Sequence, residues 1–270
     1  MKYKLIVSDF DDTIVDDSQI MSEAFRKAVK DYRAKGGIFT FATGRMISAI
    51  IDYARDLGLK GDLIGYQGAV IADIESGEFL RTTPIKKETA LAIARFLEEQ
   101  GIYYQIYDDD TFVVEKVTDY SLLYSRFTKK DMIVNSAPLT EYIIKNELSP
   151  VKMLLVCEPS QVKEYMSILN NEFGEEVLIN TSKPFIIEII NKDVNKGQAV
   201  KNLADSLGIK QEEVICIGDS QNDIPMIEYA GLGAVVANGS IEARAAADLI
   251  IPANVDDGVA YLINNYALKD

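Results

Sequence analysis

Continuous apolar runs alternate with helix-like stretches near both ends of the chain. Residues 4–8 and 38–42 are apolar runs, and between them residues 22–35 form a helix-like segment bounded by Ser22 and Gly36-Gly37. Such runs are typical of strands buried on both faces, and their alternation with helices is typical of a parallel sheet. The further strands expected here are 63–66, a hairpin of 69–74 and 79–82, 214–217, 233–236 and 248–251; the further helices are 47–57, 195–207, 223–229, 240–247 and one from about residue 257.

The middle of the chain has a different pattern. Residues 86–100 read as a helix, and two strand-like runs flank Asp108-Asp109-Asp110 as a hairpin. Strand-like and helical segments then follow without the regular βαβ alternation, which predicts an α+β unit. We therefore expect an α/β fold with a Rossmann-like parallel sheet and helices on both faces, formed by residues 1–82 and 189–270. An α+β domain, residues 83–188, is inserted in it. The other elements expected in the insert are strands 103–107, 111–115, 151–157, 176–181 and 185–190 and helix 160–172.

Composition narrows the possible functions. The 270 residues include 28 Lys and Arg against 42 Asp and Glu, so the formal net charge is 28 − 42 = −14. This charge argues against binding to nucleic acid or to anionic membranes. No apolar stretch approaches the roughly 18 residues of a membrane span, and Ser8 and Asp9 interrupt the N-terminal apolar run too early for a signal peptide. We expect a cytoplasmic protein without nucleic-acid or membrane partners.

The chain has no histidine and only two cysteines, Cys157 and Cys216. Both cysteines lie in apolar runs, which favours buried, inert thiols. The absence of histidine excludes triads that use it and HExxH zinc sites. Any acid–base or nucleophilic work therefore falls to carboxylates, Lys, Ser, Thr, Tyr or Cys.

Carboxylates cluster where the first apolar run ends, at Asp9, Asp11 and Asp12. Residues two apart in an extended strand point the same way, so Asp9 and Asp11 can face one site. Carboxylates held this close repel each other unless a cation with a preference for oxygen ligands lies between them. From these residues alone, an acidic turn or a solvated strand end is an equally open interpretation.

A later apolar strand also runs into carboxylates, at Asp219 and Asp223. Asp219 follows the strand and Asp223 lies one helical turn beyond it, so the segment offers further oxygen ligands for a cation. The alternative is a Gly-Asp turn followed by a helix cap.

Two further segments carry groups that suit an anion. Thr43-Gly44-Arg45 leads from a strand into a helix, where a hydroxyl and free backbone N–H groups can bind a phosphate oxygen. Lys196, in Asn195-Lys196-Gly197, opens a helix and could neutralise an anion. A simple N-cap and a solvated lysine are the alternatives.

Taken in order, these segments resemble the four motifs of the haloacid dehalogenase (HAD) superfamily. The position and size of the insert are similar to the C2B cap of the Cof-type subfamily, and the resemblance covers essentially the whole chain. It implies a lid-like cap that recognises the leaving group. The motifs are Asp9-Phe10-Asp11-Asp12-Thr13, Thr43-Gly44-Arg45, Lys196-Gly197 and Gly218-Asp219-Ser220-Gln221-Asn222-Asp223.

The resemblance implies a division of roles among the acids. Asp9 would be the nucleophile that forms an aspartyl-phosphate, and Asp11 would protonate the leaving oxygen and then activate water. Mg²⁺ would be held by Asp9, the backbone carbonyl of Asp11 and Asp219, with Asp223 in support. The catalytic set implied is Asp9, Asp11, Thr43 and Lys196, and the phosphate-binding set is Phe10 (through its N–H), Thr43, Gly44, Lys196 and Asn222.

The implied activity is Mg²⁺-dependent hydrolysis of phosphomonoesters on small phosphorylated metabolites, with sugar phosphates as the expected class. A phosphomutase or phosphotransferase of the same fold and a non-catalytic metabolite-binding protein are the alternatives. The intact acid set argues against the last. We expect a monomer or a weak homodimer.

Two residues depart from the family pattern. Asp12 stands where glycine is usual, and Gln67, in Gln67-Gly68-Ala69, stands where asparagine is usual. Asp12, Arg45 and Gln67 receive no role. The tyrosines of the insert could stack on a sugar or ring, but we expect most to be structural.

Overall fold

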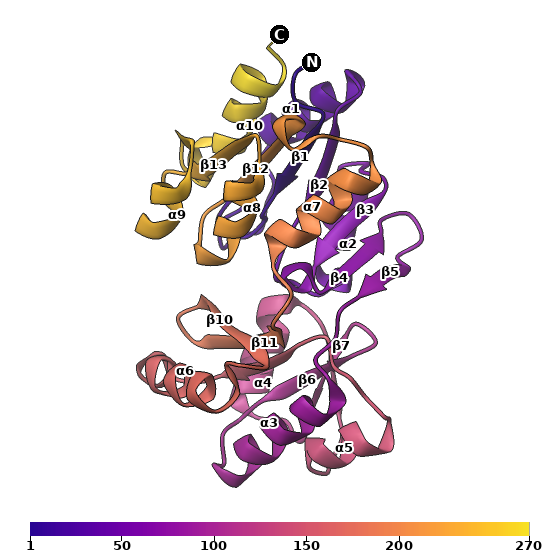
Figure 1. Cartoon of the computed structure of the whole chain (residues 1–270), viewed down its shortest axis with the longest axis vertical. Coiled ribbons are helices and arrows are strands. Elements are labelled where there is room, and N and C mark those ends of the chain that lie inside the picture. Colours follow the sequence, from indigo (N-terminus) through magenta and orange to yellow (C-terminus); the bar gives the residue numbers. More distant parts are fainter. Residues whose placement is uncertain (270) are drawn as a thin grey trace. The chain divides into compact units, whose positions relative to one another are not determined.

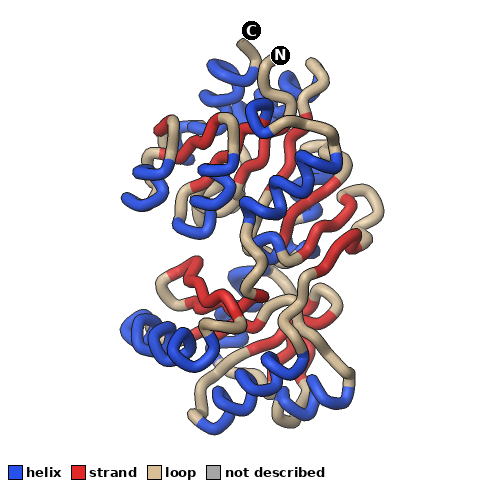
Figure 2. Tube along the Cα trace, in the orientation of Figure 1, coloured by secondary structure: helices blue, strands red, loops and turns tan. Residues whose placement is uncertain are grey.

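The structure, a computed structural model, describes residues 1–269, without the side chain of Ser182. It forms two compact units, shown in Figures 1 and 2. The second unit extends beyond the expected 83–188 at both ends and also takes in residues 45–49, which the sequence analysis had assigned to the first. The first unit is Met1–Gly44, Ile50–Leu80 and Asn195–Asp270, and the second is Arg45–Ala49 and Arg81–Val194.

A five-stranded parallel sheet is the centre of the first unit. Within it, β1 lies between β12 on one side and β2 on the other (Ile6 opposite both Ile215 and Phe39). The strands are short and apolar, and all except the edge strand β14 are almost wholly buried, as the continuous apolar runs predict. In order across the sheet they are β14 (Leu249–Ile251), β13 (Leu232–Val236), β12 (Val214–Gly218), β1 (Leu5–Ser8) and β2 (Ile38–Phe41).

Helices cover both faces of this sheet. On one face, Val200 of α7 and Met226 of α8 pack on Val7 in a buried apolar cluster. On the other, the ring of Phe25 in α1 meets that of Phe39 edge to face. Ser22, the expected start of this segment, caps α1 by accepting a hydrogen bond from an amide of its first turn. The helices are α1 (Glu23–Ala34), α2 (Ile51–Asp56), α7 (Lys196–Ser206), α8 (Ile224–Tyr229), α9 (Ile241–Ala246) and α10 (Gly258–Leu262).

A small second sheet lies in the first unit, apart from the last two residues of its third strand. It contains β3 (Asp62–Gly65), β4 (Val70–Asp73) and β5 (Phe79–Thr82), in that order, with β3 and β4 antiparallel. A parallel bridge between Ala42 and Ile64 connects it to the end of β2. This bridge fixes the chain just before Thr43.

The second unit is an α+β domain built on a six-stranded sheet. Three of its helices, α3, α5 and α6, cover one face with a buried apolar cluster. No element is predicted from the sequence between residues 116 and 150, where the structure has α4, β8 and α5. The strands in order are β10 (Val177–Lys183), β11 (Ile186–Asn191), β9 (Met153–Val156), β6 (Gln105–Asp108), β7 (Thr111–Val114) and β8 (Met132–Val134); the helices are α3 (Lys87–Glu99), α4 (Asp119–Thr128), α5 (Leu139–Lys145) and α6 (Pro159–Phe173).

The helix expected over 47–57 is interrupted. A 3₁₀ turn, Ile47–Ala49, precedes α2, and the carboxylate of Asp110 accepts hydrogen bonds from the amides of Ile47 (2.9 Å) and Ser48 (2.5 Å). Asp110 lies in the β6–β7 hairpin, so an acid distant in sequence binds the amides at the start of this turn.

Over residues 1–269, no helix combines the length and apolar character that crossing a membrane requires.

Candidate active site

The expected site residues follow three neighbouring strands of the first unit. Asp9 comes directly after β1, Thr43 comes two residues after β2, and Asp219 comes directly after β12. Because β12, β1 and β2 are adjacent and parallel, their carboxyl ends lie at the same edge of the sheet. Lys196 is the first residue of α7.

Lys196 connects two of the acids. Its Nζ donates to Asp9 Oδ1 at 2.6 Å and to Asp223 Oδ1 at 2.6 Å. Lys196 is 1% exposed, Asp223 0% and Asp9 6%, so three charged side chains share a buried cluster. Buried charges are found in this way only when they are paired or bind an ion.

Asp223 also shapes the loop that carries Asp219. Its second oxygen, Oδ2, accepts from the backbone N–H groups of Asp219 and Ser220, both at 3.0 Å. This close packing requires a glycine at position 218, where a Cβ atom would lie 2.4 Å from the Cβ of Asp223. The Gly-Asp-x-x-Asn-Asp spacing thus places the Asp223 carboxylate against the end of β12, where the loop begins.

Thr13 holds Asp219 from the opposite segment. Thr13 is fully buried, and its hydroxyl donates to Asp219 Oδ1 at 3.1 Å. The turn before it is left-handed at Asp12 (φ +59°), a conformation that glycine adopts freely and aspartate tolerates. Asp12 therefore fits the place where glycine is usual, and its carbonyl accepts from Asn238 Nδ2 at 2.8 Å. The sequence motifs alone assign no role to Thr13.

Burial and mutual repulsion shift the pKa values of two acids upward. For Asp9, burial is the largest cause; Lys196 opposes it, Asp223 and Asp11 add to it, and the pKa rises to about 7. For Asp219, burial and then the charges of Asp9 and Asp223 raise the pKa to about 8. For Lys196, burial disfavours the charged form, but the two carboxylates it contacts outweigh burial and raise its pKa.

These groups suit a hard divalent cation. Carboxylate oxygens of Asp9, Asp219 and Asp223 lie within 4.8 Å of one another. One lysine faces three acids, so the ionised cluster carries an excess of negative charge, which adds to burial in raising the pKa values of Asp9 and Asp219. A divalent cation with oxygen ligands would offset that excess. Asp223 already uses both oxygens, on Lys196 and on backbone amides, so it fits a supporting position better than direct coordination.

The expected phosphate-binding residues lie in neighbouring loops of the same unit. Thr43 is buried, its N–H donates to Ile64 O at 3.0 Å, and its carbonyl accepts from Gln67 N at 2.9 Å. Asn222 donates from Nδ2 to Gln67 Oε1 at 2.9 Å. Gln67, for which the sequence analysis found no role, therefore contacts both Thr43 and Asn222. No sequence signal beyond its departure from the family pattern pointed to it.

The remaining expected residues adjoin these. Phe10 follows Asp9, with its ring packed between Phe41 and Tyr53. Asp11 lies in the next turn, and its negative charge contributes to the raised pKa of Asp9. Gly44 follows Thr43 at the end of the segment that belongs to the first unit.

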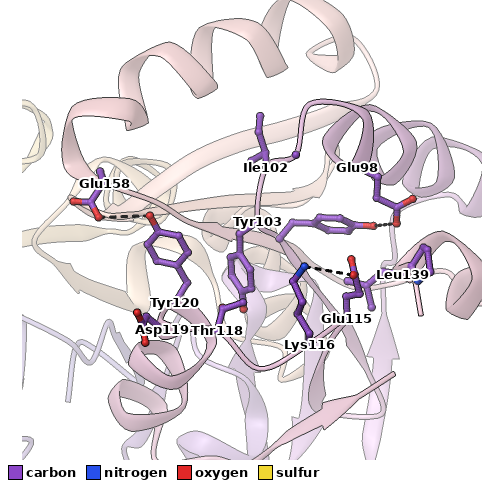
Figure 3. A pocket seen from close by; sticks show the side chains of 13 residues that line it. Glu98, Ile102, Tyr103, Glu115, Lys116, Thr118, Asp119, Tyr120, Leu139 and Glu158 are labelled. Atoms are coloured by element: carbon purple, nitrogen blue, oxygen red, sulfur yellow. Dashed lines mark hydrogen bonds and ion pairs between the residues drawn. The ribbon is translucent and has the colours of Figure 1, made fainter. Parts of the chain in front are cut away.

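Most tyrosines of the second unit have structural partners. Tyr107 and Tyr124 are buried and hydrogen-bonded to each other, and Tyr104 donates to Glu98 at 2.7 Å. Tyr103 and Tyr120, whose ring centroids are 5.6 Å apart, line a cavity of about 760 Å³ within this unit, as Tyr104 does (Figure 3). Their hydroxyls also have partners, Gln105 Oε1 at 3.0 Å and Glu158 Oε1 at 3.5 Å.

The carboxylate of Glu98, which lines that cavity, accepts hydrogen bonds from two neighbouring residues. Besides Tyr104, it accepts hydrogen bonds from the backbone N–H and the hydroxyl of Thr140, in the first turn of α5. Glu98 therefore acts as an anchor for α5, as expected for a carboxylate at a helix N-terminus.

Comparison with known proteins identifies the family. A model of the haloacid dehalogenase-like hydrolase family matches residues 6–263. The Bacillus subtilis protein YxeH, described as a phosphatase, is 30% identical and covers 98% of this chain and 99% of its own length. The B. subtilis 5-amino-6-(5-phospho-D-ribitylamino)uracil phosphatase YcsE is 28% identical, covering 98% and 96%. A crystal structure of a Thermotoga maritima protein superposes with a TM-score of 0.86 at 28% identity, covering 99% and 98%. The chain therefore belongs to the haloacid dehalogenase-like hydrolase family and is an enzyme of its phosphatase group.

Proposed function

We propose that this enzyme is a Mg²⁺-dependent phosphomonoester hydrolase that acts on small phosphorylated metabolites. The observation that carries the proposal is the buried cluster in which Lys196 bridges Asp9 and Asp223, with an oxygen of Asp219 within 4.8 Å. It combines a carboxylate nucleophile, a fixed positive charge and oxygen ligands for a hard cation. Phosphoryl transfer needs these parts because a negatively charged nucleophile must approach a negatively charged phosphate.

In the first step, a carboxylate oxygen of Asp9 forms a bond to phosphorus while the bond from phosphorus to the ester oxygen breaks. Asp11 gives its proton to that oxygen, and the alcohol leaves. The Lys196 ammonium offsets the negative charge of the remaining phosphoryl oxygens, and Thr43 and Asn222 donate hydrogen bonds to them. Positioned donors of this kind typically contribute a factor of ~10²–10³ to the rate.

In the second step, Asp11 takes a proton from water as the water oxygen attacks phosphorus. The bond between phosphorus and the Asp9 carboxylate breaks, which releases inorganic phosphate and restores both acids to their starting states. One residue thus serves as acid and then as base, as microscopic reversibility allows.

The carboxylates of Asp9 and Asp219 and the backbone carbonyl of Asp11 are the groups proposed to hold Mg²⁺. A cation held by these groups would supply positive charge that offsets the repulsion between the carboxylate nucleophile and the phosphate. Asp223 contributes indirectly, by holding Lys196 and the loop of Asp219.

We assign sugar phosphates as the substrate class. The support is the relative YcsE, whose named substrate carries its phosphate on a ribityl chain, a reduced sugar. The substrate class is therefore a more specific proposal than phosphomonoester hydrolysis, and it needs its own test.

The test is hydrolysis of p-nitrophenyl phosphate and of a panel of sugar phosphates, acyclic polyol phosphates and phosphorylated carboxylic acids, with Mg²⁺ and with EDTA. We expect release of inorganic phosphate only with Mg²⁺, with the highest kcat/KM on sugar or polyol phosphates. Return of the phosphoryl group to the sugar would indicate a mutase. No turnover of any ester with Mg²⁺ present would refute the proposed activity.

A further inference from the structure

The loop between β3 and β4 has an unusual backbone. Three successive residues have positive φ: Tyr66 (+51°), Gln67 (+60°) and Gly68 (+102°). Glycine adopts such angles readily, but two side-chain-bearing residues in a row do not. A backbone of this kind persists only where the surrounding structure holds it, and it is concentrated at functional sites.

The loop contacts segments that carry three of the four motifs. The N–H of Gln67 donates to Thr43 O at 2.9 Å, and its side-chain oxygen accepts from Asn222 Nδ2 at 2.9 Å. Gly68 lies so close to the start of α7 that a Cβ atom on it would be 2.7 Å from the carbonyl oxygen of Asn195, the residue before Lys196. All of these contacts are within the first unit.

Gln67 also determines how the amide of Asn222 is oriented. Asn222 Oδ1 accepts from the hydroxyl of Ser220 at 2.6 Å, and Nδ2 donates to Gln67, which is only 2% exposed. Both ends of the amide are therefore held. An amide nitrogen carries two hydrogens, so one donor remains after the bond to Gln67 is made.

We infer that Gln67 is a positioning residue for phosphoryl transfer. Its backbone N–H holds Thr43 and its side chain holds Asn222. The Thr43 hydroxyl and the Asn222 amide can therefore bind phosphoryl oxygens together. The inference rests on the proposed function, because it assigns the phosphate-binding role to these two residues. It adds a residue that acts through others and touches no reacting atom.

The contact between Gln67 and Asn222 depends on the length of the Gln67 side chain. Asparagine at position 67 would place its amide about 1.5 Å nearer the backbone, and the 2.9 Å contact with Asn222 would fall outside the hydrogen-bonding range. Gln67→Met keeps the length of the side chain and removes the amide, whereas Gln67→Asn keeps the amide on a shorter side chain. Both variants should therefore lose the hydrogen bond to Asn222.

Steady-state hydrolysis of p-nitrophenyl phosphate with Mg²⁺ tests this. We expect both variants to lower kcat about tenfold, the effect of one lost hydrogen bond, with KM changed much less, because charge on the phosphoryl oxygens is greatest in the transition state. Gln198→Met is the matched control, since Gln198 is exposed on α7 and contacts Asn202, and its kcat should be unchanged. Thermal unfolding shows whether each variant is folded.

A double-mutant cycle distinguishes positioning from a general structural effect. If Gln67 acts through Asn222, Gln67→Met in an Asn222→Ala background should lower kcat no further. If the double variant instead lost kcat by the product of the two single-variant factors, the inference would be overturned. A wild-type kcat in Gln67→Met would overturn it as well.

Calorimetric binding of inorganic phosphate with Mg²⁺ separates this inference from the proposed function. Wild-type binding that weakens in Gln67→Met by a factor no larger than the small rise in KM, and that is unchanged in Gln198→Met, supports the inference without reference to turnover. If the wild type hydrolyses esters and both variants match it in turnover and phosphate binding, only the inference fails. If the wild type neither hydrolyses esters nor binds phosphate, both fail.

Discussion

Lys196 and Asp223 form a fully buried ion pair, with Nζ 2.6 Å from Oδ1 and 1% and 0% of the two side chains exposed. The same Nζ is equally close to Asp9, so the lysine that would face the phosphate is already held by the nucleophile and by a second acid. Its position is set before any ligand binds. Preorganised charge of this kind requires no rearrangement when the transition state forms.

Asp9→Asn should abolish hydrolysis without unfolding the protein. An amide cannot serve as the nucleophile, and we expect kcat to fall by more than about 10³-fold. Stability should not decrease, because the raised pKa of Asp9 shows that its ionised form is unfavourable where it lies. Steady-state kinetics and urea unfolding near neutral pH check the two statements. Residual activity near that of the wild type would assign the nucleophile elsewhere.

Lys196→Met should be strongly destabilising as well as inactivating. Removing the ammonium leaves Asp223 buried with no countercharge, a change that typically costs about 3–5 kcal/mol. Lys201→Met is the control, because Lys201 pairs with Asp205 at the exposed surface of α7, where such pairs contribute about 0–1 kcal/mol.

Combining Lys196→Met with Asp223→Asn should restore part of the lost stability, since the second change removes the orphaned charge. Urea unfolding of the single and double variants gives the comparison. A Lys196→Met variant as stable as Lys201→Met would contradict the assignment of a buried pair.

The elements that sequence could predict are those whose residues carry a strong local pattern. The strands of the first unit are continuous apolar runs, and most of its helices appear within a residue or two of the expected bounds. The region 116–150 lacks such a pattern. Leu122 and Leu123 of α4 are exposed, and β8 has three residues, of which Ile133 and Val134 are exposed. Apolar side chains that face solvent give no periodicity from which to predict an element.

In the candidate active site, too, only the residues that belong to local sequence patterns could be predicted. Asp9, Lys196, Asp219 and Asp223 stand at fixed spacings in short motifs, so their clustering could be expected. Pairs such as Thr13 with Asp219 join residues 206 positions apart. Those contacts arise from how the loops are packed, which no local pattern records.

Thr13→Val should weaken the response to Mg²⁺ more than it weakens the fold. The hydroxyl of Thr13 orients Asp219, and loss of a partner that orients a metal ligand typically lowers affinity by about 10–100-fold. The Mg²⁺ concentration for half-maximal activity should rise accordingly. Thr40→Val is the matched control: Thr40 is also buried, and its hydroxyl donates to the carbonyl of Asp62 at the start of β3. Equal Mg²⁺ requirements in the two variants would mean that Thr13 is only structural.

Stability of the metal-free enzyme should decrease as pH rises from near 4 toward 8. Burial, followed by charge effects, raises the folded pKa values of Asp9 and Asp219 from 3.8 to about 7 and about 8. An acid with a higher pKa in the folded state binds more protons when folded, so its contribution to stability is complete below the unfolded pKa and is lost as pH passes the folded pKa. Thermal unfolding in EDTA across this range measures the effect.

Added Mg²⁺ should stabilise the enzyme increasingly over the same range. The cation binds the ionised carboxylates and must displace the protons that they hold at low pH. The rise in Tm on adding Mg²⁺ should therefore be small near about pH 5 and large above pH 8, where both acids are ionised. The Asp9→Asn/Asp219→Asn double variant removes both titrating groups and should lose the Mg²⁺ effect together with this part of the pH dependence. A Mg²⁺ effect that is independent of pH, or that survives in the double variant, would place the cation site on other residues.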